Sequence, residues 1–526
     1  MKVLSVYSET SQEWLLQQLK AGRVSGCGPC VPVLTAEDIK ATPTIVGQIG
    51  PEPMLQAMAA HPDFDILVTG RAYDPSPFVA FCAFNSSTKP YADLNSTTLG
   101  GFTHMGKLME CGGACATPKC AASMAVVYRD GPFDIRPLAS GSRCTATSVA
   151  AHALYEKSRP DILHGPGGYL DLTTANYSVL GDGISVHIDG SVFNASKQEN
   201  TPYTMKFEGA KIIGYRTIFM GSFSDPTLIR QLPSFLSRVR GYVTQQHSQV
   251  RDAWSLDFHI YGINPNIPAE PRGEVFLIGE ALAQNQALAT GIASCARVAC
   301  VHGPYAGQKA TSGNFGMGIG GKLEIEMGVC SEFSVYHLVE LHEGQEYAEE
   351  IQFQNQSEAV EEDDGKFVKW QMHLLGKGPR IDKIDCHAPE ESINGERTNE
   401  LAPGSNMPPA ASLAHPKTLG DIASVVRSKN AGPYEITLDV IFDDPVVYRR
   451  IKEGRLLTPE RIAVLYGITV ADIVWSGFFD PALAFKATIP RRRDGKPQSS
   501  GAFMENDVHG SQNHLLLLNL TLEGAI

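Results

Sequence analysis

The chain has 526 residues, 43% of them hydrophobic and 19% charged, so it can bury a sizeable core and form two or three domains. Its formal net charge of −13 argues against a general affinity for nucleic acid or anionic membranes, and no apolar run is long enough to span a bilayer. Residues 1–10 lack the pattern of a signal peptide, so we expect a cytoplasmic protein with no nucleic-acid or membrane partner. The 11 cysteines, an odd number, are typical of reduced thiols.

Residues 1–84 alternate short strand and helix patterns, which predicts a βαβα order. The run 65–71 is apolar and ends in a glycine and a charge, as a buried parallel strand does where it meets the binding crevice of an open α/β sheet. Arg71 and Asp74 follow this strand. Arginine can hold a carboxylate through two hydrogen bonds, and aspartate can act as a base or metal ligand. The alternative, of equal weight, is an Arg–Asp pair that only fixes the loop.

A helical stripe over 104–111 places His104, Lys107 and Cys111 on one face, with Glu110 beside Lys107. Lys107, Glu110 and Cys111 thus offer an acid, a base and a nucleophile on adjoining faces of one turn. General acid–base catalysis needs such groups within hydrogen-bonding reach of one substrate proton. The alternative is an ordinary Lys–Glu helix pair with Cys111 in the core.

A small-residue helix is predicted over 144–157. Arg143 precedes it and Thr145 and Ser148 lie in its first turns, so its N-terminus is a candidate carboxylate or phosphate site, with simple capping as the alternative. Further strands are predicted near 203–220, 256–263 and 274–278, and a helix over 281–300.

The glycine run 316–321 has the GxGxxG spacing, but an alternating strand pattern follows it where a dinucleotide site requires a helix. We therefore expect neither NAD nor a flavin. No histidine motif typical of a metal site occurs, so the sequence gives a divalent cation no support and does not exclude one.

Residues 354–415 are first acidic and then proline-rich, which predicts a linker. The order of strands and helices over 416–526 predicts a small ferredoxin-like α+β domain. In this domain Arg427, Lys429 and Asn430 precede a Gly-Pro turn and could close over a polyanionic substrate. A solvated basic loop is the alternative.

Several motifs of residues 1–345 resemble the acyclic terpene utilisation family, AtuA. They include VTGRAYDP at 68–75, HMGKLMECG at 104–112, GPGG at 165–168 and EFSVYHL at 332–338. Residues 416–526 resemble a small domain of unknown function often fused to that family, through RSKNAGPYE at 427–435. The resemblance implies a large α/β body with a mixed sheet over 1–353, and it adds Asn314, in a family motif, to the candidate binding residues.

The family is associated with the metabolism of branched carboxylic acids or their CoA thioesters, which implies lyase or hydratase chemistry. We expect Glu110, Lys107, Cys111 and Asp74 to be catalytic. The expected ligands of the carboxylate or acyl-CoA substrate are Arg71, His104, Arg143, Thr145, Ser148, Asn314, Arg427, Lys429 and Asn430. A non-catalytic carboxylate-binding subunit and a Cys111-dependent acyl transferase or hydrolase are alternatives. We also expect a homo-oligomer, and a site where the two domains meet.

Overall fold

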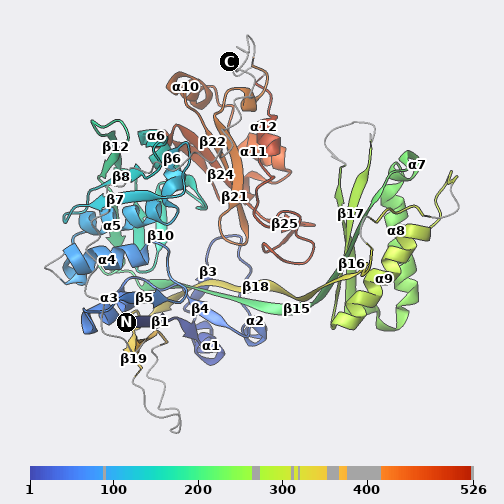
Figure 1. Cartoon of the computed structure of the whole chain (residues 1–526), viewed down its shortest axis with the longest axis horizontal. Coiled ribbons are helices and arrows are strands. Elements are labelled where there is room, and N and C mark those ends of the chain that lie inside the picture. Colours follow the sequence, from blue (N-terminus) through green and yellow to red (C-terminus); the bar gives the residue numbers. More distant parts are fainter. Residues whose placement is uncertain are drawn as a thin grey trace, which may run out of the picture.

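The computed structural model describes residues 1–86, 90–262, 273–309, 313–317, 320–351, 367–375 and 416–522. They form an α/β body, a distal lobe and a C-terminal α+β domain (Figure 1). Buried hydrophobic side chains form four clusters. One of the two in the body also contains Ile441, Phe479, Ala482 and Ala484 of the C-terminal domain, so the domain packs on the body through apolar side chains. Within the described segments, no helix combines the length and the hydrophobicity that crossing a lipid bilayer requires.

The body begins with a mixed four-stranded sheet in the order β19-β20-β1-β5. Strand β1 (Lys2–Tyr7) pairs in parallel with β5 (Ile66–Thr69) and antiparallel with β20 (Lys369–Leu374), and β19 (Glu349–Glu350) forms the edge. The connecting elements are α1 (Gln12–Lys20), β3 (Val24–Gly26), α2 (Ala36–Ala41), β4 (Ile45–Gly47), α3 (Glu52–Ala60) and α4 (Ser76–Ser86). The mixed α/β body and the parallel strand before Arg71 are therefore confirmed. The prediction that this strand is buried was wrong, because β5 is an edge strand that exposes Ile66 and Val68.

Strand β20 lies inside the range that the sequence assigned to a linker. Val368 and Trp370 are buried in the same cluster as Leu4 and Val6 of β1. The linker prediction was therefore wrong for residues 367–375, because a short strand can complete a sheet from a region of polar composition. Residues 354–366 and 376–415 lie outside the described residues.

Helix α5 (Ser96–Met109) is the central helix of the body and is buried from Thr98 to Leu108. The side chain of Asn95 caps its first turn by accepting a hydrogen bond from the Thr98 amide. Two antiparallel sheets, in the orders β12-β13-β8-β7 and β10-β11-β14, accompany it. Their strands are β7 (Ser123–Val127), β8 (Phe133–Pro137), β10 (Ile162–Gly165), β11 (Gly168–Asp171), β12 (Asn176–Val179), β13 (Val186–Asp189) and β14 (Val192–Ala195).

The helix expected over 144–157 is shorter in the structure. Helix α6 (Ala146–Ala150) continues into a 3₁₀ turn, Ala151–Leu154, and the chain then extends at Tyr155. Glu156 has a positive φ of 55°, in the left-handed region that non-glycine residues rarely adopt. Residues 155–159 therefore form a connecting segment and present Lys157 outside any helix.

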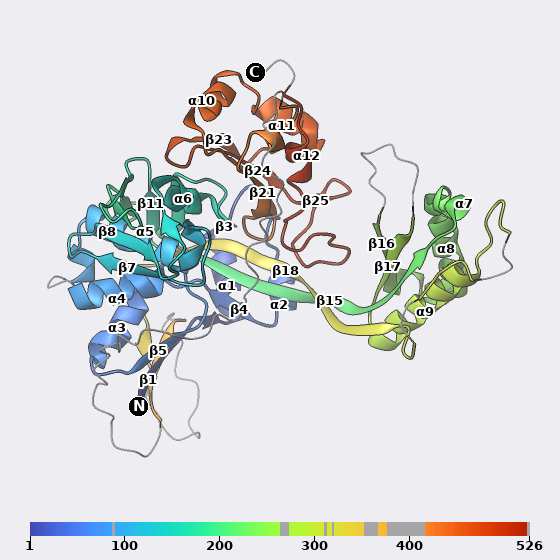
Figure 2. The same ribbon diagram turned by 45° about the horizontal axis from the view of Figure 1, so that its top comes forward.

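Strands β15 (Tyr203–Phe223) and β18 (Ile325–Leu341) run antiparallel from the body into the distal lobe (Figures 1 and 2). In the lobe, β17 (Val275–Ala283) pairs with β15, and β16 (Trp254–Tyr261) forms the edge. Helices α7 (Pro226–Ile229), α8 (Leu232–Gln246) and α9 (Gln286–His302) pack on this sheet around Phe219, Phe223 and Phe235. The sequence predicted β15, β16, β17 and α9 without separating the lobe from the body. It missed α7 and α8, and it began the last helix at residue 281, which lies in β17.

The C-terminal domain has an antiparallel sheet in the order β21-β22-β24-β23. The strands are β21 (Val425–Asn430), β22 (Glu435–Ile441), β23 (Trp475–Phe479) and β24 (Ala484–Pro490), and the helices are α10 (Pro445–Glu453), α11 (Pro459–Tyr466) and α12 (Leu515–Leu518). The α+β class is confirmed. The ferredoxin-like detail was wrong, because α10 and α11 both fall between two hairpins, whereas that fold alternates strands and helices as βαββαβ.

Candidate active site between the two domains

One face of the C-terminal sheet packs on the body and holds residues 154–158. The buried Lys486 donates hydrogen bonds of 2.8 Å to the Leu154 carbonyl and to Asp439 Oδ1. Thr488 Oγ1 donates to the Ser158 carbonyl at 2.6 Å, and Ser158 Oγ donates to Glu435 Oε2 at 2.6 Å. The C-terminal domain therefore fixes the backbone on both sides of Lys157.

A cavity of about 340 Å³ lies at this junction. The body lines it with segments 27–29, 156–159 and 162–166 and with side chains of Tyr73, Lys206 and Tyr336, among others. The C-terminal domain contributes Ala431, Gly432, Glu435 and Val474. Two domains distant in sequence thus form one site.

Lys157 is a cation of this cavity without an anionic partner. Its Nζ lies 5.1 Å from the centroid of the Tyr73 ring, and among the described residues no carboxylate lies within ion-pairing distance of it. Burial lowers the pKa of the Lys157 ammonium, and the nearby charge of Glu110 partly offsets this effect. Lys157 is therefore easier to deprotonate than a solvated lysine.

Tyr73 adds a second unsatisfied group to the cavity. Its side chain is 5% exposed, and its hydroxyl has no hydrogen-bond partner among the described residues. A buried hydroxyl without a partner costs about 1–3 kcal/mol. Burial raises the pKa of Tyr73, so the hydroxyl remains a proton donor. A ligand that accepts a hydrogen bond would satisfy it.

Lys206 is held in place by its neighbours. Its Nζ lies 2.6 Å from Glu208 Oε1 and donates to the Tyr336 hydroxyl at 3.4 Å. Glu208 also accepts two hydrogen bonds from Arg71, at 2.9 and 3.3 Å. Arg71 therefore binds a carboxylate of the protein itself, in place of the substrate carboxylate that we predicted. Asp74 lies 3.6 Å from Arg71 Nη1, as the loop-fixing alternative proposed.

Glu435 is the carboxyl group that the C-terminal domain brings to the cavity. Burial raises its pKa, and the hydrogen bond from Ser158 opposes this effect. Glu435 is therefore a candidate proton donor. The C-terminal domain approaches the body closely beside it, because Gly432 has a φ of +71° and a Cβ there would lie 2.4 Å from the Tyr336 hydroxyl.

Residues of helix α5 lie beside the cavity and do not line it. Lys107, 2% exposed, forms an ion pair with Glu110, as the structural alternative proposed. His104 does not join them, because its Nδ1 lies 2.7 Å from Ser191 Oγ and its ring packs against Phe133. Burial lowers the pKa of His104 to about 3, so the ring is neutral.

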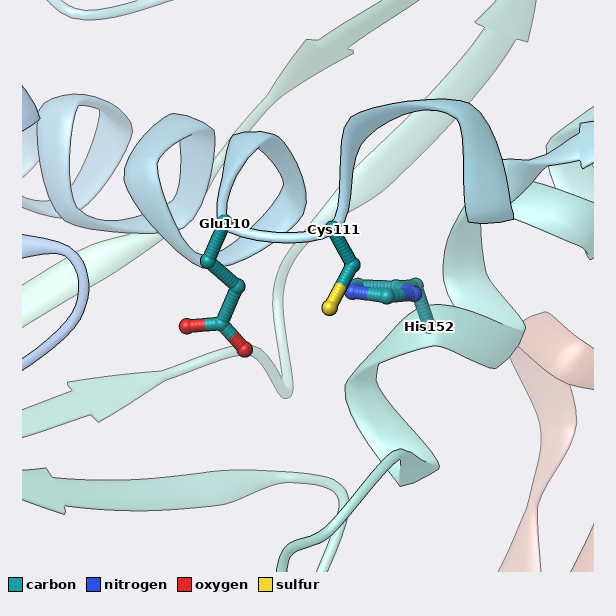
Figure 3. Close-up of side chains that lie close together, drawn as sticks. All are labelled: Glu110, Cys111 and His152. Carbon is teal, nitrogen blue, oxygen red and sulfur yellow. The ribbon is translucent and has the colours of Figure 1, made fainter. Parts of the chain in front are cut away.

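Cys111 lies next to Glu110 and to His152, which belongs to the 3₁₀ turn after α6 (Figure 3). One potential ligand atom from each residue lies within 4.8 Å of the other two. Burial lowers the pKa of His152 to about 3, and burial together with Glu110 raises the pKa of Cys111. A protonated thiol beside a neutral imidazole is a poor nucleophile, which counts against the Cys111-dependent alternative.

The residues before α6 have structural roles. Arg143 is exposed on β9 (Arg143–Cys144), opposite Thr117. Thr145 and Ser148 form a reciprocal capping box, and Ser148 Oγ also donates to the Cys115 carbonyl at 2.7 Å. The capping alternative therefore accounts for both hydroxyls, and the structure does not bring them to the cavity.

The other predicted substrate ligands, in the C-terminal domain and the distal lobe, interact with groups of the protein itself. Arg427 donates to Asp439 at 2.9 Å, and both Arg427 and Lys429 lie over the Tyr155 ring, 5.7 and 5.8 Å from its centroid. Asn430 donates to the Val508 carbonyl at 2.7 Å. Asn314 belongs to the distal lobe, where its side chain donates to the Gly303 carbonyl at 2.7 Å. The structure therefore separates Asn314 from the cavity.

Sequence reasoning missed Lys157, Tyr73, Lys206 and Glu435 as site residues. Tyr73 lies inside the VTGRAYDP motif, and Glu435 closes the RSKNAGPYE motif, so a wider reading of both motifs would have included them. Lys157 and Lys206 had no local signal, because a lysine in a connecting segment or on a strand is usually solvated.

The fold and the cavity define a two-domain α/β protein whose polar site is closed by its C-terminal domain. A family model described as acyclic terpene utilisation family protein AtuA matches residues 32–316, more than half of the chain, and the chain belongs to this family. Residues 419–521 match a domain of unknown function (DUF4387). Both matches confirm the resemblance read from the sequence. No curated protein and no solved structure matches the chain.

Proposed function

We propose that this chain is an enzyme of the lyase or hydratase type that acts on a branched carboxylic acid or its CoA thioester. The observation that carries the proposal is Lys157, which lines the cavity between the domains and has no carboxylate within ion-pairing distance among the described residues. A carboxylate or thioester oxygen that entered the cavity would accept a hydrogen bond from Tyr73, whose hydroxyl has no other partner among the described residues.

Lys157 and Glu435 suit the two halves of an elimination. A lysine whose pKa is lowered can take a proton from the carbon next to the carboxyl or thioester group, and a carboxyl group whose pKa is raised can give one. In this proposal the electron pair of the broken C–H bond forms the double bond, and the β-hydroxyl leaves as water with the proton from Glu435. Addition of water is the reverse.

The remaining side chains position the substrate and the acid. Lys206 would bind the carboxylate, and Arg71 acts through Glu208 to hold Lys206 in place. Tyr73 would donate a hydrogen bond to the oxygen that gains charge when the proton leaves. Lys157 and Glu435 replace Glu110 as the expected proton carrier, because Glu110 does not line the cavity and its carboxylate binds Lys107.

The size of the cavity favours a small acyl group. A volume of about 340 Å³ lies at the lower end of the range typical of ligand pockets. Such a space accommodates a small acid, or the acyl end of a thioester whose CoA part remains outside.

The test begins with a thermal-shift screen of branched mono-, di- and tricarboxylic acids and their CoA thioesters, with product analysis of each compound that binds. Lys157→Met should lower kcat of the identified reaction by at least about 100-fold, the lower range for a general acid–base residue. Lys157→Arg should retain binding and lose turnover, because its guanidinium stays protonated.

Lys452→Met is the matched control, because Lys452 is an exposed lysine of the C-terminal domain. Turnover by Lys157→Met at the wild-type rate would refute the proposed base. Binding without any product would support a non-catalytic carboxylate-binding module instead.

A further inference from the structure

Glu110, Cys111 and His152 come from two turns that helix packing brings together. Helix α5 ends at Met109, Cys111 precedes the 3₁₀ turn Gly112–Cys115, and His152 lies on the 3₁₀ turn Ala151–Leu154. In Figure 3 the Cys111 sulfur lies next to the edge of the His152 ring, and the Glu110 carboxylate lies on the opposite side of the sulfur. A thiol, an imidazole and a carboxylate are the three side-chain types that bind zinc.

The separations suit one shared ion. The three ligand atoms lie within 4.8 Å of one another. Zinc bonds to sulfur, nitrogen and oxygen are about 2.0–2.3 Å long, so ligands of one tetrahedral ion lie roughly 3.5 Å apart. Binding one ion therefore requires the side chains of Glu110 and Cys111, at the end of a helix, to turn toward it.

The buried ring of His152 is a second, independent observation that points to a bound ligand in this cluster. The residue is 5% exposed, and its Nε2 is buried without a hydrogen-bond partner among the described residues. A neutral imidazole is the form that binds metals. Its ring stacks on Tyr155 at 5.7 Å with an interplanar angle of 15°, which fixes the ring orientation. Cys111 is exposed, so an ion can enter from solvent.

The charges around the cluster act in both directions. Lys107 donates to Glu110 Oε1, which leaves Oε2 for an ion. Arg427 and Lys429 lie beyond the Tyr155 ring and repel a cation. A Cys111 thiolate would add one negative charge to the Glu110 carboxylate, whose own charge is shared with Lys107. Thiolate and imidazole ligands favour Zn²⁺ over Mg²⁺ or Ca²⁺.

We propose that Glu110, Cys111 and His152 bind one Zn²⁺ ion, with a fourth position open to water or a ligand. Three protein ligands and one open position are typical of catalytic rather than structural zinc sites. The site lies outside the residues that line the cavity, and its existence does not depend on the proposed reaction. Metal binding can therefore be measured without a substrate.

The experiment measures metal binding to the full chain. The protein is stripped with a chelator, reloaded with Zn²⁺, dialysed, and analysed for metal by mass spectrometry. One ion per chain is expected. Protein loaded with Co²⁺ should show a thiolate-to-metal charge-transfer band, which reports a cysteine ligand directly.

Cys111→Ser should abolish the cobalt band and weaken Zn²⁺ binding by more than about 100-fold, because even outer-shell partners are worth 10- to 100-fold. Cys111 is exposed, so this variant should fold, and His152→Gln provides a second ligand test. Cys120→Ser is the matched control, because Cys120 is a half-buried thiol of the same body outside the cluster. The proposal is overturned if the wild-type chain binds no stoichiometric ion, or if Cys111→Ser and His152→Gln bind it as the wild type does.

Discussion

Replacing Lys486 by methionine tests how much this buried lysine stabilises the C-terminal domain and its contact with the body. Lys486 is 0% exposed and Asp439 1% exposed, and their charged atoms lie 2.8 Å apart. The substitution also removes the donor to the Leu154 carbonyl. Asp439 keeps one cation, Arg427, whose Nε lies 2.9 Å from Oδ2.

The expected loss of stability follows from the charge of Asp439, which stays buried when Lys486 is removed. Removing one partner of a buried ion pair costs about 3–5 kcal/mol, because the other charge remains buried. Arg427 still neutralises part of the Asp439 charge, so we expect Lys486→Met to lose about 3 kcal/mol of unfolding free energy, the lower end of that range. Lys452→Met is the control, because its pair with Asp480 at 2.6 Å is 42% and 67% exposed, and exposed pairs contribute at most about 1 kcal/mol.

Hydrogen exchange followed by mass spectrometry measures the free energy of local opening in each domain. In Lys486→Met, exchange should accelerate in β22, β24 and residues 154–158, and binding of any cavity ligand should weaken because Lys157 belongs to that segment. The Lys452→Met chain should exchange like the wild type in these peptides. If Lys486→Met loses no more stability than Lys452→Met, neither the buried pair with Asp439 nor the hydrogen bond to Leu154 stabilises the fold as reasoned here.

Two further predictions concern the body. Burial lowers the pKa of His104 to about 3, whereas a histidine in the unfolded chain titrates near 6.5, so below pH 6.5 the unfolded state binds more protons and the free energy of unfolding falls by about 1.4 kcal/mol per pH unit. Urea unfolding at pH 6.5 and pH 5 should therefore show a smaller loss of stability in His104→Gln than in the wild type, and an equal loss in both would contradict this assignment. Glu156 has a φ of 55°, a left-handed conformation that strains a β-branched side chain but not glycine. Glu156→Val should therefore destabilise the protein by about 1 kcal/mol or more and Glu156→Gly should not, and equal unfolding midpoints for the two variants would contradict this backbone strain.

Local patterns in the sequence determined several elements of this protein and the family to which it belongs. The apolar run before Gly70 and Arg71 predicted the parallel strand β5, and the stripe over 104–111 predicted the buried end of α5. These predictions succeed because the period of the apolar residues depends only on the geometry of a single strand or helix.

Tertiary structure alone decided which side chains share a site. Arg71 lies 137 residues from the Glu208 that it binds, and Lys486 lies 332 residues from the Leu154 carbonyl that it holds. Periodicity shows which face of an element is apolar, but it carries no information on which distant element covers that face.

Lys157 illustrates the difference. The sequence placed it at the end of a small-residue helix, where a lysine is expected to be solvated. In the structure the helix ends early, the C-terminal domain binds the carbonyls of Leu154 and Ser158, and Lys157 faces the cavity without an anionic partner among the described residues. Its environment depends on two domains that meet only in the folded chain, so the sequence alone could not reveal it.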